Sequence, residues 1–146
     1  MSREAEIIES FRNRGILEYV EAYRHIRDEI ARKINYLRNI KIDVSSYEER
    51  FNMLKKRAVE TASLIKKSDQ EFITGITSVI SDLNKLYDEL EIVYSDVNKI
   101  TENLKKLEEL YNSGKISQKV YKRLKKEYLD KIARLSLEGH TIIKKS

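Results

Sequence analysis

The longest regular pattern of apolar residues in this chain lies in its second half. Apolar side chains recur there at alternating steps of three and four residues, the spacing of a single helical face. Such a sustained seam is typical of coiled-coil packing, and it predicts one long helix over residues 69–112. The eleven members of the seam are Ile76, Val79, Leu83, Leu86, Leu90, Val93, Val97, Ile100, Leu104, Leu107 and Tyr111.

A second column of side chains, one step beyond the seam, changes character along the same helix. It is apolar in the first half and polar in the second. A wide apolar stripe needs more than one neighbouring helix to cover it, whereas a narrow seam needs only one. We therefore predict a bundle body around residues 73–94 that narrows to a two-helix hairpin near residue 111. The column consists of Ile73, Ile80, Tyr87 and Tyr94, followed by Thr101 and Glu108.

A short turn after the long helix leads into another helical pattern. Gly114 suits the left-handed residue that closes a helix, and Ser117 suits the cap of the next one. We predict a helix over residues 117–143, antiparallel to the long helix because the connection is short. Its apolar face, which extends the coiled-coil seam, is formed by Tyr121, Leu124, Tyr128, Ile132 and Leu135.

The first half of the chain predicts two further helices, over residues 2–40 and 46–66. Gly15 lies inside the first, where it either separates a short leading helix or is tolerated at a cost of about 1 kcal/mol. A polar stretch at residues 68–71 either begins a new helix or lies within a continuous one. The pattern does not decide whether residues 45–111 form one helix or two.

Composition agrees with an all-α fold of three to four long helices in a single domain over residues 1–146. Charged residues make up 36% of the chain, and there are four glycines and no proline. The chain has no cysteine, which excludes disulfides and fits a cytoplasmic protein. We also expect no signal peptide and no membrane span. The Ile, Lys and Glu usage resembles that of a thermophile, although an AT-rich genome also favours Ile, Lys and Asn.

Charge is unevenly distributed between the two helices of the expected hairpin. Residues 68–113 hold four lysines against ten acids, and residues 114–146 hold ten basic residues against three acids. The two arms are therefore complementary. Asp82, Glu89 and Asp96 recur every seven residues beside the seam, where lysines of a neighbouring helix could meet them.

Several cations of the last helix point away from its apolar face and form what we term the basic tip. They suit contact with phosphate, either in nucleic acid or at an anionic membrane surface. The alternative is a solvated face of a helical hairpin, and no aromatic platform for base stacking lies among them. The basic tip consists of Lys115, Lys119, Lys122, Arg123, Lys125 and Lys126.

We find no pattern that predicts catalysis. The chain has no phosphate-binding glycine loop, and its two histidines, His25 and His140, stand apart from any paired carboxylates. We therefore expect no catalytic residues, no metal site, no cofactor and no small-molecule substrate.

The run LEELYNSGKISQKVYKRLKKEYLDKIARL, residues 107–135, resembles the hairpin turn of archaeal coiled-coil proteins. It is similar to the coiled-coil domain of the Cdv cell-division family that recruits ESCRT-III-like partners. The resemblance covers 29 of the 146 residues. That family also carries an N-terminal β-barrel and a C-terminal recruiting tail, and neither pattern is visible here. The resemblance implies either the coiled-coil part alone or a shorter relative.

These patterns together predict a non-enzymatic helical scaffold or adaptor that acts through coiled-coil contacts with protein. We expect it to self-associate as a homo-oligomer, in archaeal cell division or membrane organisation. The alternative is a module that binds nucleic acid or an anionic membrane through the basic helix at residues 117–143.

Overall fold

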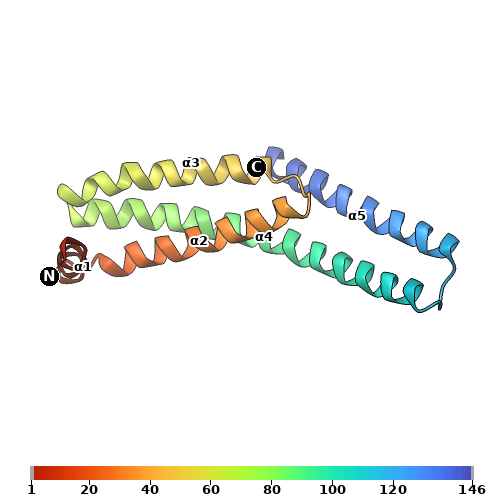
Figure 1. Ribbon diagram of the computed structural model, residues 1–146. Helices are drawn as coiled ribbons and strands as arrows, with labels where there is room; N and C mark the ends of the chain where they lie inside the picture. Colours follow the sequence, from red (N-terminus) through yellow and green to blue (C-terminus); the bar gives the residue numbers. More distant parts are fainter. Residues whose placement is uncertain (1, 146) are drawn as a thin grey trace. The chain divides into compact units, whose positions relative to one another are not determined.

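The computed structural model describes the backbone of residues 2–145 and the side chains of residues 2–135. This part of the chain is almost entirely helical and contains no strand, which confirms the all-α prediction. It has five α-helices where three to four were expected. The elements are α1 (Arg3–Asn13), α2 (Leu17–Asn39), α3 (Ser45–Ala62), the 3-10 helix η1 (Ser63–Lys66), α4 (Asp69–Asn112) and α5 (Gln118–Lys145) (Figure 1).

The additional helix comes from a break at Gly15. This glycine has a φ of 73°, in the left-handed region where a side chain would be strained. The amide of Ile16 donates to the carbonyl of Phe11 at 3.0 Å, which closes the end of α1 as in a Schellman motif. The segment predicted as one helix over residues 2–40 is therefore two helices. Of the two possibilities at Gly15, the separation of a short leading helix is the correct one.

Residues 45–111 also form more than one helix. The chain leaves the α-helical path after Ala62, passes through η1, and begins α4 at Asp69. Ser68 caps the new helix, since its hydroxyl accepts a hydrogen bond from the amide of Glu71 at 3.3 Å. The polar stretch at residues 68–71 is thus a helix start and not a patch within a continuous helix.

The described chain divides into two compact units. Helices α2 and α4 each begin in unit 1 and end in unit 2. Unit 1 holds residues up to 32 together with 47–88. Arg14, just after α1, joins Asp69 at the start of α4 through its Nε at 3.0 Å, and it also donates to the carbonyl of Ile65. The core of this unit contains Ile16, Ile26, Ile30, Tyr47, Phe51, Leu54, Ala58, Phe72, Ile76, Val79, Leu83 and Leu86.

Unit 2 holds residues 33–46 together with those from 89 onward. Its helices are joined by polar contacts as well as by apolar packing. Tyr36 in α2 donates its hydroxyl proton to the side-chain oxygen of Asn98 in α4 at 2.8 Å. The ring of Tyr36 also meets the ring of Tyr94 edge to face, with 5.0 Å between the centroids. The buried apolar residues are Ile34, Leu37, Ile42, Val44, Leu90, Val93, Val97 and Leu107.

The connection between α4 and α5 has the predicted turn chemistry. Gly114 has a φ of 76°, and the amide of Lys115 donates to the carbonyl of Leu110 at 3.0 Å. The hydroxyl of Ser117 accepts from the amide of Val120 at 3.3 Å and so caps α5. Both residues therefore have the roles expected from the sequence.

Candidate interaction surfaces

The seam of α4 is sealed in its first part and open in its last part. Every seam residue from Ile76 to Val97 is buried, and Leu83, Leu86 and Leu90 are 0% exposed. Farther along, Leu107 is buried but Ile100, Leu104 and Tyr111 are only half-buried. The apolar face thus continues past Val97, where the rest of the chain covers it only in part.

The column beside the seam changes in the same direction. It is half-buried in the first part of α4 and exposed in the last part, which matches the predicted narrowing of the covered stripe. The half-buried members are Ile73, Ile80, Tyr87 and Tyr94, and the exposed ones are Thr101 and Glu108.

The apolar face of α5 is half-buried along its described length. It packs against α4 near the turn, where the rings of Tyr111 and Tyr121 stack with their centroids 4.4 Å apart. None of the five predicted face residues is fully covered: Tyr121, Leu124, Tyr128, Ile132 and Leu135 all keep part of their surface exposed.

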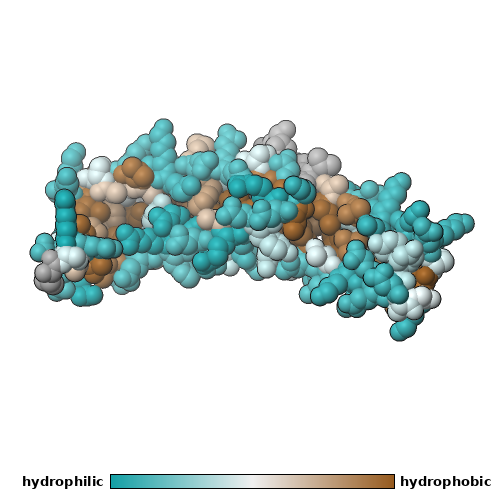
Figure 2. Space-filling model, viewed as in Figure 1, coloured by the Kyte–Doolittle hydropathy of each residue, from teal (hydrophilic) through white to brown (hydrophobic). Residues whose placement is uncertain are grey.

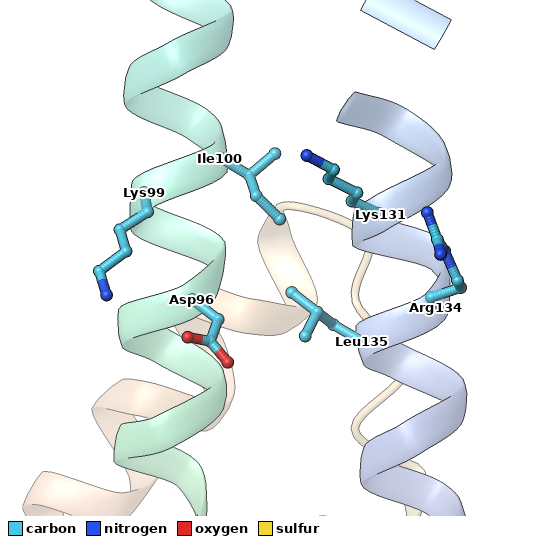
Figure 3. Close-up of a pocket in the computed structure, with 6 residues that line it drawn as sticks. All are labelled: Asp96, Lys99, Ile100, Lys131, Arg134 and Leu135. Carbon is cyan, nitrogen blue, oxygen red and sulfur yellow. The ribbon is translucent and has the colours of Figure 1, made fainter. Parts of the chain in front are cut away.

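A groove of about 370 Å³ lies between α4 and α5 within unit 2. Ile100 and Leu135 extend into it from the two helices, and Lys99 is directed away from α5 (Figure 3). Figure 2 shows brown, apolar surface between α4 and α5, bordered by polar groups. Asp96, Lys131 and Arg134 complete the lining. The sequence analysis did not single out Lys99, Lys131 or Arg134. Lys131 and Arg134 reach the groove only because the two helices pack together.

Unit 2 also exposes large apolar side chains outside the groove. Ile92 and Leu110 in α4 are 65% and 40% exposed, and Leu129 in α5 is 49% exposed. Ile92 and Leu110 lie on the same side of α4, because their separation of 18 residues makes a whole number of helical turns. Leu110 therefore adds exposed apolar surface beside the last part of the seam, and Ile92 adds it beside the buried part.

The basic tip is presented to solvent. Its members Lys119, Lys122 and Lys126 are exposed, as are Lys115 and Arg123. Lys125 is half-buried, with its ammonium group 5.5 Å from the centroid of the Tyr121 ring. This places five of the six predicted cations where an external anion could reach them.

The acids of α4 do not neutralise the described part of α5. Asp82 pairs with Arg57 of α3 at 2.8 Å, and Glu91 pairs with Lys33 of α2 at 2.6 Å. Between α4 and residues 118–135 of α5, no ion pair is formed. The complementary arms predicted from the sequence are therefore not held together by ion pairs over this range.

Neither a cluster of three metal-binding side chains nor a buried polar side chain is found among the described residues. His25 is exposed, and the side chain of His140 lies outside the described residues. Among the described helices, none has an apolar stretch long enough to traverse a bilayer. No family model, curated protein or solved structure matches the chain.

Proposed function

We propose that this protein is a non-enzymatic helical scaffold or adaptor that self-associates through α4 and α5 of unit 2. One observation carries the proposal: the apolar seam stays regular to Tyr111 and along α5, yet the chain covers it only partly beyond Val97. Contiguous exposed apolar surface often marks an interaction site. Packing against another copy would remove that surface from water.

The contacts within unit 2 support an antiparallel coiled-coil hairpin as the interacting element. The stacked rings of Tyr111 and Tyr121 lie near the turn, whereas Ile100 and Leu135, much farther from the turn, line one groove. When residues at similar distances before and after a turn lie next to each other, the two helices run in opposite directions. Two such hairpins can pack face to face with the acidic α4 of each copy beside the basic α5 of the other. This arrangement buries both open seams and pairs opposite charges, which favours one orientation.

We expect charge at the exposed apolar positions of α4 to abolish self-association. The variant Ile92→Glu with Leu110→Glu changes two exposed side chains, so the fold should persist while the contact is lost. Light scattering after size exclusion measures the mass. The matched control is Asn52→Glu with Met53→Glu, at two exposed positions of α3 in unit 1, which should assemble as the wild type does. If both variants assemble equally, unit 2 is not the contact.

We further propose that the scaffold works in the cytoplasm, in cell division or in membrane organisation. The absence of cysteine supports the location, and the similarity of residues 107–135 to archaeal coiled-coil proteins supports the process.

A second candidate function is phosphate binding by the basic tip. The observation in its favour is that its cations, all within the described residues, form no ion pair with a carboxylate. Clustered unpaired cations attract the phosphates of nucleic acid or of an anionic membrane.

Charge reversal at the basic tip tests this second function. Lys119→Glu with Lys122→Glu and Lys126→Glu should abolish binding to a short DNA duplex and to anionic vesicles, with helicity unchanged. Wild-type binding that engages about six phosphates would weaken with salt at a log–log slope near −5. Binding that survives the triple reversal would show that the tip is not the site.

A further inference from the structure

Unit 1 carries an apolar surface of its own, separate from the seam of α4 and α5. Two adjoining hollows of about 350 and 300 Å³ share Phe11, Val20 and Arg24 as lining residues. The first lies between α1 and α2, and the second continues over α2, α3 and the start of α4. Figure 2 shows brown, apolar surface beside α1 at the left of the view. The shared residues border both hollows, and we term the two hollows together the α1–α3 groove.

Uncovered apolar side chains line this groove together with several charged ones. Helix α1 has no buried residue, although Ile7 and Ile8 lie on it and are 44% and 37% exposed. Val59 of α3, in the second hollow, is 73% exposed. The floor of the second hollow is formed by Ala58, Phe72 and Ile76, which are buried. A floor sealed by core residues with exposed apolar walls offers an apolar ligand contacts on several sides.

The charges at the second hollow have a single sign. Arg24 and Arg27 line it, and none of its other lining residues is acidic. Arg24 is exposed, and Arg27 pairs with its neighbour Asp28 at 3.1 Å and lies 5.7 Å from the centre of the Tyr23 ring. Arginine binds carboxylates through two parallel hydrogen bonds, so an occupant with acidic flanks would gain at the second hollow. The first hollow is balanced in charge, because Glu4 and Glu21 line it beside Arg3 and Arg24.

A helix is the occupant that the shape and the charges favour. An amphipathic helix places apolar side chains about one turn apart along one face, and two adjoining hollows can take successive side chains of such a face. An apolar floor offers nothing to a phosphate, so nucleic acid or a lipid headgroup would use only the rim. From this groove we propose that unit 1 binds an amphipathic helix of a partner protein, with apolar anchors in the two hollows and carboxylates at Arg24 and Arg27.

This binding site would make the protein an adaptor with two separate surfaces, and it does not depend on self-association through unit 2. Substitutions in the groove should leave self-association unchanged, and Ile92→Glu with Leu110→Glu should leave groove binding unchanged. Failure of one proposal is therefore distinguishable from failure of the other.

The test uses two labelled synthetic helical peptides of about five turns that share one leucine face. In the first peptide the positions that flank the leucine face are glutamates, and in the second peptide the same positions are lysines. Fluorescence anisotropy with the full chain should show the acidic peptide binding about tenfold or more tighter than the basic one. The variant Arg24→Glu with Arg27→Glu should reverse this preference.

A matched variant controls for net charge. Lys56→Glu with Lys105→Glu reverses two exposed cations outside the groove, and it should keep the preference for the acidic peptide. A variant in the hollow, Val59→Glu, changes an exposed side chain and should weaken the binding of both peptides. Absence of acidic-peptide binding overturns the proposal, as does equal binding of the two peptides. Self-association that Arg24→Glu with Arg27→Glu abolishes would instead place a second copy in the groove, and would also overturn it.

Discussion

Leu90 and Leu104 occupy equivalent positions in one heptad seam but have different surroundings in unit 2. Leu90 is 0% exposed, whereas Leu104 is half-buried. Because the apolar repeat is equally regular at both, the sequence alone does not distinguish them. What differs is the number of neighbouring helices, which only the fold supplies.

Truncation of these two leucines should have unequal effects on stability. Leu90→Ala removes fully buried methyl groups and leaves a cavity, so we expect it to lower the free energy of unfolding by about 2–5 kcal/mol. Leu104→Ala should cost about 1 kcal/mol, since its side chain is partly in water already. Chemical denaturation followed by circular dichroism measures both values. Equal losses would show that the end of the seam is as well covered as its middle.

A charged residue within an apolar face has partners that the sequence does not indicate. Lys33 interrupts the apolar face of α2, and the sequence offers no partner for it. In the structure its ammonium group lies 2.6 Å from a carboxylate oxygen of Glu91 and 4.2 Å from the centroid of the Tyr94 ring. Both partners are far away in sequence, so spacing along the chain could not indicate them.

At the scale of elements, the sequence predicted the long helix and its C-terminal end, and it left open whether a new helix starts at residues 68–71. Helix α4 covers residues 69–112 as expected, because a regular seam, the cap at Ser68 and the glycine after the helix all act locally. The break at Gly15 and the short η1 were less predictable. A glycine in a helical pattern is compatible with continuation or with termination, and tertiary contacts such as that of Arg14 with Asp69 favour termination here.

The close approach of α3 and α4 at Gly75 is another feature that the pattern did not indicate. A Cβ atom on Gly75 would lie 2.8 Å from Cγ2 of Thr61, which is too short for two carbon atoms. Thr61 cannot easily rotate away, because it is β-branched and its hydroxyl donates to the carbonyl of Arg57 at 2.8 Å. The contact thus depends on a residue without a side chain.

Substitution of Gly75 by alanine should therefore destabilise the protein despite the higher helix propensity of alanine. We expect Gly75→Ala to lower the free energy of unfolding by about 1–2 kcal/mol, as overpacking does. In a Thr61→Ala background the same change should be neutral or stabilising by up to about 1 kcal/mol. A double-mutant cycle by chemical denaturation measures the coupling. Additive effects of the two changes would contradict the close contact.

At the scale of the whole molecule, charge and apolar surface are distributed in a way that suits contacts with other molecules. The last 33 residues hold ten basic residues against three acids, and the acids Asp82 and Glu91 of α4 pair with α3 and α2 instead of with α5. Unit 1 has the α1–α3 groove, and unit 2 has an open seam. The sequence indicated the seam, its narrowing and the cations of the basic tip, but it did not indicate that Ile92, Leu110 and Leu129 remain exposed.

The mass of the wild-type chain in solution tests the proposed scaffold most directly. Light scattering coupled to size exclusion would be performed at low and high salt, with and without a short DNA duplex. We predict a stable dimer or larger oligomer whose mass is unchanged by the duplex, because the open seam is buried between copies. A monomer at every concentration that shifts onto the duplex at low salt and leaves it at high salt would contradict self-association. It would assign the function to the basic tip instead.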